Sequence, residues 1–233
     1  MRSMDPVQGT PIGETPVQAL PQFWTEALAV PPASGSRLAR FILRVLGWRL
    51  DFQGLPAMQG VILVYPHTSN WDFVVGILAK WALGLHFRFW GKDSLFRMPL
   101  FGAWVRYLGG VPVNRGSSQG VVGDTAELMK KAGERQEMFW LAVAPEGTRS
   151  WIAGWRTGAY HVAVQARVPV GLAYLDFASR RIGLTQFVRL SGDVDRDFAL
   201  FKSHLCSVRG LRAEQASPIQ ALASHSASKG GRA

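Results

Sequence analysis

Two short segments of the sequence carry side chains that could do chemistry. In the first, His67 stands five positions before Asp72, and the Ser69-Asn70 pair between them favours the start of a helix. A helix that begins there lets the Asp72 carboxylate reach one ring nitrogen of His67, so that the other nitrogen can take a proton from a hydroxyl. The same residues also fit a helix cap beside a histidine that has no catalytic role.

The second segment, residues 144–150, could bind an anion. It contains Glu146, Gly147, Thr148 and Arg149. Glycine permits a close approach of the backbone, and hydroxyl, guanidinium and backbone N–H groups are donors that suit a phosphate. Arg115, after another apolar run, adds a second guanidinium. Taken alone, the segment also fits a polar turn with a surface arginine, and an isolated arginine such as Arg115 is more often a solvated charge.

Apolar runs predict the elements that must position both segments. Residues 61–65 and 139–143 are continuously apolar, which is typical of strands buried on both faces. Further strands are predicted at residues 87–90, 111–113, 168–175 and 182–190, and helices at residues 71–83, 99–108, 120–132, 158–166 and 198–211. Their alternation predicts an α/β fold with a mixed, largely parallel sheet flanked by helices. Ligands bind beyond the carboxyl ends of such strands, and both segments fall there.

Outside this core, the sequence predicts three flanking parts. Residues 1–36 are rich in Pro, Gly and Thr and are predicted to be a poorly ordered leader with one short apolar segment. Residues 37–50 are predicted to be a basic amphipathic helix, and residues 51–200 the catalytic domain. Residues 201–233 are predicted to be a terminal helix followed by a disordered tail.

The amphipathic helix has two interpretations. Arginines occupy one side of it, and the other side carries Leu38, Phe41, Ile42, Val45 and Leu46 at helical spacing. It could be an ordinary surface helix that packs on the core. It could instead lie in a membrane interface, with Trp48 and the arginines at the level of the headgroups.

Composition excludes several classes of protein. The chain has 233 residues, 48% hydrophobic and 18% charged, which excludes collagen-like, coiled-coil and low-complexity proteins. Neither a transmembrane helix nor a signal peptide is predicted. The single cysteine, Cys206, cannot form an intramolecular disulfide and is not expected to be a nucleophile. A net charge of +10 with nine tryptophans indicates an acidic partner with an apolar part, either nucleic acid or an anionic membrane.

Four motifs, at residues 67–72, 113–115, 145–150 and 168–170, resemble in their order and spacing those of the lysophosphatidic acid acyltransferase (1-acyl-glycerol-3-phosphate acyltransferase) family, over roughly residues 37–200. The resemblance implies that His67 and Asp72 are the catalytic pair. It implies that the acceptor's phosphate and glycerol are bound by Lys92, Arg115, Glu146, Gly147, Thr148 and Arg149, and that Val168, Pro169 and Val170 help to form the acyl-chain pocket. Ala144 and Pro66 stand where the family usually has Phe and Asn, and the second proline expected after Pro169 is replaced near Leu172. These departures affect the shape of the pockets and leave every charged or proton-transferring group in place.

The resemblance implies an O-acyltransferase that moves a fatty acyl chain from an acyl thioester to the free hydroxyl of a lysophospholipid. The expected acceptor is 1-acyl-glycerol 3-phosphate, giving phosphatidic acid. Acyl-CoA or acyl carrier protein would be the co-substrate, with no bound cofactor and no metal. It favours the membrane interpretation of residues 37–50, with anionic lipids as partners at the cytoplasmic face. Alternatives are another acceptor, a lyso-aminolipid or glycerol 3-phosphate, a catalytically inactive lipid-binding module, or a basic nucleic-acid-binding protein, although no helix-turn-helix, zinc or RNP pattern is present.

Overall fold

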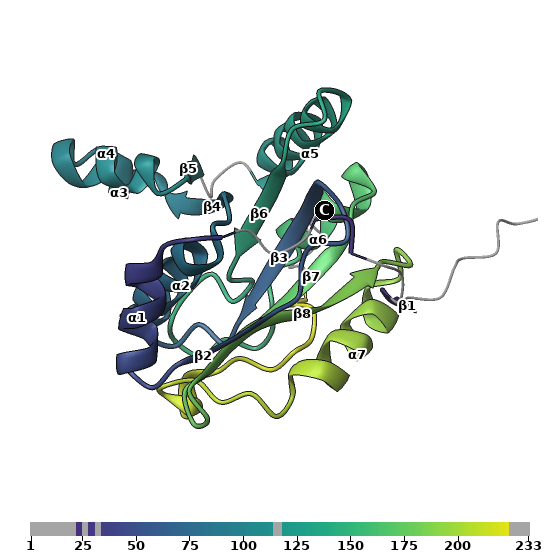
Figure 1. Cartoon of the computed structure of the whole chain (residues 1–233). Coiled ribbons are helices and arrows are strands. Elements are labelled where there is room, and N and C mark those ends of the chain that lie inside the picture. Colours follow the sequence, from purple (N-terminus) through teal and green to yellow (C-terminus); the bar gives the residue numbers. More distant parts are fainter. Residues whose placement is uncertain (1–21, 25–27, 31–33, 114–117, 224–233) are drawn as a thin grey trace, which may run out of the picture.

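The computed structural model describes residues 22–24, 28–30, 34–113 and 118–223, and within them a sheet of eight strands carries helices on both faces (Figure 1). The strands are β1 (Gln22–Phe23), β2 (Arg49–Phe52), β3 (Gln59–Tyr65), β4 (Phe87–Lys92), β5 (Gly110–Val113), β6 (Phe139–Val143), β7 (Val170–Asp176) and β8 (Arg181–Arg189). The helices are α1 (Arg37–Val45), α2 (Asn70–Leu83), α3 (Asp93–Phe96), α4 (Pro99–Tyr107), α5 (Ser118–Glu134), α6 (Gly158–Ala166) and α7 (Val194–Leu205), with a 3-10 turn at Ala213–Gln215.

The sheet is mixed and mostly parallel, as the sequence predicts. Its order is β1-β8-β7-β3-β6-β4-β5, and β2 also pairs with β8. Strands β7, β3, β6, β4 and β5 run parallel, with β3 at the centre between β6 and β7. Strand β8 is antiparallel to β7, parallel to β2 and antiparallel to β1. The carboxyl ends of the five parallel strands therefore meet at one edge, where the predicted functional segments follow β3 and β6.

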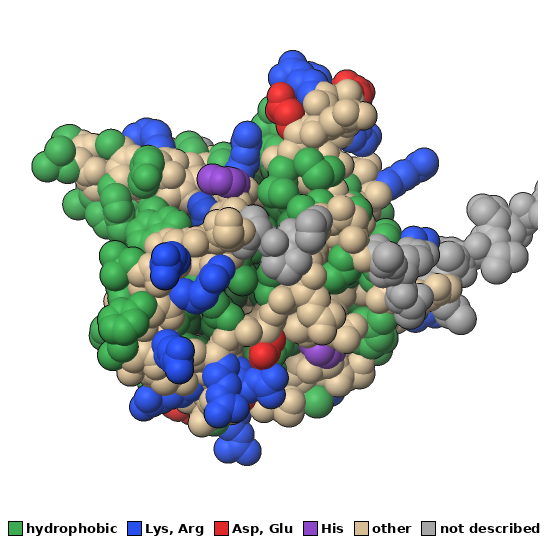
Figure 2. Space-filling view, viewed as in Figure 1, with side chains coloured by type: hydrophobic (Ala, Val, Ile, Leu, Met, Phe, Trp, Pro, Cys, Tyr) green, Lys and Arg blue, Asp and Glu red, His purple; other side chains and the backbone are tan. Residues whose placement is uncertain are grey.

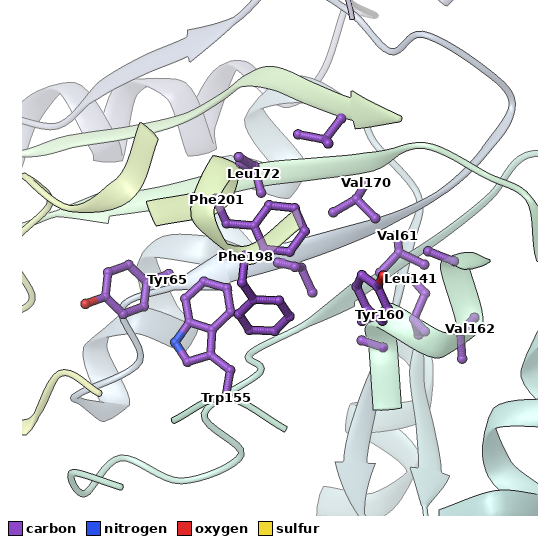
Figure 3. Close-up of a cluster of buried hydrophobic side chains, with 14 of the residues drawn as sticks. Val61, Tyr65, Leu141, Trp155, Tyr160, Val162, Val170, Leu172, Phe198 and Phe201 are labelled. Carbon is purple, nitrogen blue, oxygen red and sulfur yellow. The ribbon is translucent and has the colours of Figure 1, made fainter. Parts of the chain in front are cut away.

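Alternating side chains of β3 fill two cores. Val61 and Leu63 are buried on the face covered by α5, α6 and α7, in a cluster with Trp155 and Phe201 (Figure 3). Ile62 is buried on the opposite face. Each large apolar side chain that is fully buried contributes about 1.5–3 kcal/mol, so burial on both faces holds β3 firmly in register.

Helix α1 is shorter than the amphipathic helix predicted over residues 37–50. It ends after Val45, because Gly47 adopts a positive φ of 78° and the chain reverses into β2. Residues 49 and 50 therefore pair with β8 instead of continuing the helix. The side of α1 that packs on the core carries Ala39 and Leu43, which are not part of the predicted apolar face.

The C-terminal part differs from the predicted helix over 198–211 and disordered tail. Helix α7 starts earlier, because the Asp193 side chain caps its N-terminus by accepting from the backbone N–H groups of Asp195 and Arg196. After α7 the chain packs back on the domain: Trp155 N–H donates to the carbonyl of Gln220 at 2.7 Å, and buried Ile219 joins the main core. Residues 224–233 of the predicted tail lie outside the described residues.

The predicted leader also contains paired residues. Strand β1 pairs with the end of β8, and Val30 forms a β-bridge with Leu55. The Arg189 guanidinium lies over the Trp24 ring, 4.2 Å from its centroid. Residues 1–21, 25–27 and 31–33 lie outside the described residues.

Candidate active site

The two predicted functional segments lie side by side because they follow neighbouring parallel strands. His67 comes two residues after the end of β3, and Glu146 three residues after the end of β6. The backbone N–H of His67 donates to Oε2 of Glu146 at 2.5 Å, which joins the two segments directly. The carboxyl edge of the sheet therefore assembles a single site from both motifs.

His67 and Asp72 form the predicted pair. Their Nδ1 and Oδ2 atoms are 3.2 Å apart, with the His67 side chain 21% exposed and that of Asp72 2% exposed. The same Asp72 oxygen accepts from the backbone N–H groups of Thr68 and Ser69, each at 2.7 Å. Asp72 thus both caps α2 and contacts the imidazole, so the helix cap does not exclude the His67–Asp72 pair. The pairing leaves Nε2 of His67 as the nitrogen available to a substrate.

Glu146 is fully buried and connects three parts of the chain. Its Oε1 accepts from the backbone N–H of Ser217 at 2.8 Å, while Oε2 accepts from His67. Burial raises the pKa of Glu146 above its ordinary value, and the hydrogen bonds from Ser217 and His67 act in the opposite direction. Because both oxygens are engaged by backbone groups, Glu146 positions the loops, which differs from the direct acceptor contact that the resemblance implies.

The remaining residues of the 144–150 loop are more accessible. Gly147 has a φ of 65°, which lets the chain turn sharply after β6, and its N–H donates to the carbonyl of Ala144. Thr148 is half-buried and its hydroxyl accepts from the backbone N–H of Ser150 at 3.3 Å. Arg149 is exposed and can reach a ligand from solvent.

Two further basic residues belong to the predicted acceptor site. Lys92 is the exposed last residue of β4, the neighbour of β6, so it lies at the same edge of the sheet as His67. Arg115 lies outside the described residues; the strand before it, β5, pairs in parallel with β4 and ends at that edge as well.

One apolar cavity of about 240 Å³ reaches the His67–Asp72 pair. It extends along α2 from Asp72 in the first turn to Leu83 at the last residue, a rise of about 16 Å at about 1.5 Å per residue. Its apolar lining includes Ile62, Val64, Phe73, Gly76, Ile77, Leu83, Phe87, Phe89, Ala142, Ala144, Ala173, Leu175 and Leu184. Such a cavity suits an unbranched hydrocarbon chain that ends at the histidine.

Two charged residues of the cavity lining are engaged with protein groups. Lys80 donates to the carbonyls of Phe87 and Leu108, and burial lowers its pKa. Asp51 accepts from the Tyr174 hydroxyl at 2.5 Å and from the Arg181 guanidinium. Both charged groups use their hydrogen-bonding atoms on these protein partners, and the rest of the cavity lining is mainly apolar.

Val168, Pro169 and Val170 do not line this cavity. Val170 is fully buried among the side chains under α6 and α7, on the other face of the sheet. The carbonyl of Pro169 accepts from Val61 N–H, and Val168 N–H donates to the end of α6. The structure therefore gives these residues packing contacts on one face of the sheet, whereas the apolar cavity lies on the α2 face.

Sequence reasoning missed two features of the site. The Arg156 side chain lies directly over Gly147: a Cβ atom on that glycine would be 2.8 Å from Arg156 Nε. The segment after α7 contacts both functional loops. The spacing of the motifs does not predict either feature, because both contacts form where the chain folds back after residue 150.

The described residues contain no group of three or more His, Cys, Asp or Glu side chains that could hold a metal ion. Cys206 is exposed at the C-terminal end of α7 and is not among the residues that line the cavity.

Comparisons with known proteins agree with the motif pattern. An acyltransferase family model matches residues 49–171, more than half of the chain. The 1-acyl-sn-glycerol-3-phosphate acyltransferase of Escherichia coli (strain K12) is 32% identical over 99 residues, 41% of this chain and 40% of that protein. The chloroplastic 1-acyl-sn-glycerol-3-phosphate acyltransferase BAT2 of Brassica napus is 26% identical over 126 residues, 53% of this chain and 36% of the relative.

Among solved structures, the 1-acyl-sn-glycerophosphate acyltransferase PlsC from Thermotoga maritima superimposes with a TM-score of 0.41 at 19% identity, covering 64% of each chain. The aligned segments span about two fifths of the length of the curated relatives. The family match covers β2 to the start of β7, including both functional segments. The chain belongs to the acyltransferase family.

Proposed function

We propose that this protein transfers a fatty acyl chain from an acyl thioester to the free hydroxyl of a lysophospholipid, with 1-acyl-glycerol 3-phosphate as the acceptor and phosphatidic acid as the product. The observation that carries the proposal is the His67–Asp72 pair, 3.2 Å apart, at the end of an apolar cavity. The names of the relatives support the same acceptor.

The chemistry follows from the orientation of His67. The acceptor hydroxyl oxygen attacks the thioester carbonyl carbon while Nε2 of His67 takes the hydroxyl proton. Asp72 stabilises the imidazolium that forms and keeps Nδ1 protonated. The tetrahedral intermediate then collapses, the C–S bond breaks, and the imidazolium returns the proton to the leaving sulfur. The products are the ester and a free thiol of CoA or acyl carrier protein, and no covalent acyl-enzyme forms.

The acceptor phosphate is bound by the basic residues at the same edge of the sheet. Arg149 is exposed on the loop that Glu146 fastens to His67, and Lys92 lies at the end of β4. The set that the family resemblance implies also includes Arg115 and Thr148, together with Glu146 and Gly147. A guanidinium can hold two phosphate oxygens at once, which fixes the acceptor's orientation as well as its affinity.

The acyl chain of the donor occupies the cavity beside α2. Its lining is apolar, and the His67–Asp72 pair stands at the end where a thioester carbonyl would meet the acceptor hydroxyl. Ala144, in place of the usual phenylalanine of the family motif, lines the cavity and leaves more room near His67.

The protein binds the cytoplasmic surface of a membrane peripherally. The exposed side of α1 carries Leu38, Phe41 and Val45, which are 68%, 63% and 67% exposed. Helix α4 adds Leu100, which is 89% exposed, and Tyr107. Figure 2 shows hydrophobic side chains over α1 and α4, with lysine and arginine side chains nearby. Apolar side chains flanked by basic ones suit an anionic bilayer. None of the helices in the described part of the chain combines the length and the apolar character that a membrane span requires.

An acceptor panel tests the proposed function. Purified protein is supplied with a labelled acyl-CoA or acyl carrier protein thioester and with 1-acyl-glycerol 3-phosphate, glycerol 3-phosphate or a lyso-aminolipid, each in the same vesicles. We expect labelled phosphatidic acid as the main product. Preferential labelling of glycerol 3-phosphate or of the lyso-aminolipid would replace the proposed acceptor, and absence of transfer to any acceptor would refute the proposed reaction.

A further inference from the structure

The segment that follows α7 lies against both functional loops, although it is outside residues 49–171, which match the family model. It first meets the loop that carries His67. Gly210 is so close to this loop that a Cβ atom on it would be 2.6 Å from the Thr68 hydroxyl and 3.0 Å from Pro66. The backbone N–H of Arg212 then donates to the Thr68 hydroxyl at 3.3 Å.

Gln215 is the one side chain of this segment that connects the two loops to each other. With its amide turned so that the nitrogen faces both carbonyls, it donates to the backbone oxygen of Arg149 at 2.7 Å and to that of Thr68 at 3.3 Å. The single amide group of Gln215 thus connects Thr68, the residue after His67, to Arg149 in the acceptor loop.

Ser217 completes the connection two residues later. Its backbone N–H donates to Oε1 of Glu146, whose other oxygen accepts from His67 N–H. Its hydroxyl accepts from Ile152 N–H at 3.2 Å, and its carbonyl accepts from the Tyr65 hydroxyl at 3.2 Å. Because Ser217 is fully buried, water does not replace these hydrogen bonds when one is lost.

We propose that residues 210–217 are a third component of the active site and that Gln215 is a positioning residue that sets the distance between His67 and Arg149. The argument is geometric: the hydrogen bonds of Gln215 end on backbone atoms of the two loops whose side chains bind the acceptor and take its proton. Acyl transfer depends on this distance, since a displacement of about 1 Å can reduce the rate by about a hundredfold. The inference rests on the proposed function, because the reaction defines the two sites that must be aligned.

The test compares Gln215→Glu with Gln220→Glu. Both changes keep the shape of the side chain, remove its donor group and add a negative charge. Gln215→Met, which removes the donor without adding a charge, is therefore measured beside them and should show the same changes as Gln215→Glu. Gln220 belongs to the same segment and donates to the carbonyl of Ala153 at 2.8 Å, a residue outside the acceptor loop. We expect Gln215→Glu to raise the acceptor KM about tenfold and lower kcat about tenfold, with an unchanged thioester KM. Gln220→Glu should behave as the unaltered protein does.

A merely structural role would lower the fraction of folded enzyme and the melting temperature without moving the acceptor KM. Unchanged kinetics in Gln215→Glu, or an equal effect of Gln220→Glu, would overturn the inference. A second readout needs no activity: the NMR signals of the His67 ring, assigned by their loss in His67→Ala, should shift in Gln215→Glu and stay in place in Gln220→Glu. Unshifted ring signals in Gln215→Glu would also overturn it. Absence of transfer by the unaltered protein, with shifted ring signals in Gln215→Glu, would reject the proposed function and retain the link between the loops.

Discussion

The backbone N–H of His67 donates a hydrogen bond to Oε2 of Glu146, a residue 79 positions later in the sequence. One buried carboxylate thereby holds the loop after β3 and the loop after β6 at a fixed separation. The second oxygen of Glu146 binds Ser217 N–H, so the same side chain also fastens the C-terminal segment. The Glu146 side chain therefore joins the two family motifs to each other.

Replacing Glu146 by Gln should weaken the connection between these loops. Glutamine has one acceptor oxygen, so either His67 N–H or Ser217 N–H loses its partner, at a cost of about 1–3 kcal/mol. We expect kcat for acyl transfer to fall about ten- to hundredfold, measured beside Glu134→Gln, an exposed glutamate on α5 that serves as the matched control. Equal activity of the two variants would contradict the positioning role.

The same substitution should change how stability depends on pH. Burial raises the pKa of folded Glu146 above its ordinary value of 4.5, so this group stabilises the fold below that pH and loses its contribution as the pH rises through the raised pKa. Urea unfolding at a series of pH values should show this loss in the unaltered protein and a flatter profile in Glu146→Gln. Parallel profiles would show that the pKa is not raised.

Arg149→Lys should weaken acceptor binding specifically. Lysine keeps the positive charge but cannot hold two phosphate oxygens in one plane, and a charge-assisted hydrogen bond is worth about 1.5–3 kcal/mol. The acceptor KM should rise about ten- to hundredfold and the thioester KM should stay the same, whereas Arg135→Lys, in the turn that follows α5, should change neither. An equal loss with acceptors that lack a phosphate would make Arg149 a structural residue. We expect the same pattern for Arg115→Lys.

The exposed face of α1 should control membrane binding. Changing Leu38, Phe41 and Val45 to Ser removes three side chains that are not part of the core. Each contributes up to about 1.5–3 kcal/mol when buried in a bilayer, so partition into anionic vesicles should weaken by at least about a hundredfold. Leu128→Ser, on the exposed side of α5, is the control. Cosedimentation measures both, and unchanged binding with a normal melting temperature would place the membrane contact elsewhere.

Gly76 should set the length of acyl chain that the cavity accepts. A Cβ atom at this position meets no atom within 4 Å, and the residue lines the cavity on α2. A leucine side chain can therefore enter the cavity without displacing the helix, and Gly76→Leu should shift donor preference toward shorter chains. Gly123→Leu on α5, where a Cβ atom also meets open space, is the control. Unaltered chain-length preference in Gly76→Leu would exclude this cavity as the acyl site.

Local patterns predicted most of the fold. Strand β6 and helix α6 have the predicted bounds, because a continuous apolar run and a helical repeat are each decided by a few neighbouring residues. Strand β2 was missed, since its partner is β8, about 130 positions later, and its four residues carry little apolar pattern. Long-range pairing of this kind has no local signal.

The site was predictable to the extent that it depends on motif spacing. His67 and Asp72 are close because His67 lies just before the N-cap of α2 and Asp72 lies in its first turn, and spacing alone contains that information. The roles of Val168 to Val170 and of Gln215 depend on which face of the sheet a side chain occupies and on where the chain returns after α7. Tertiary packing decides both, so a motif comparison limited to residues 37–200 could not include the C-terminal segment.

The most direct test of the account is the transfer of a labelled acyl group from a thioester to 1-acyl-glycerol 3-phosphate by the purified protein and by His67→Ala. The unaltered protein should form labelled phosphatidic acid, and the variant should lose about a hundredfold to ten-thousandfold in kcat while keeping its melting temperature and vesicle binding. Asp72→Asn should also be impaired, because the amide favours the wrong tautomer of His67. Turnover by His67→Ala at the rate of the unaltered protein would contradict the central claim that this histidine takes the acceptor's proton.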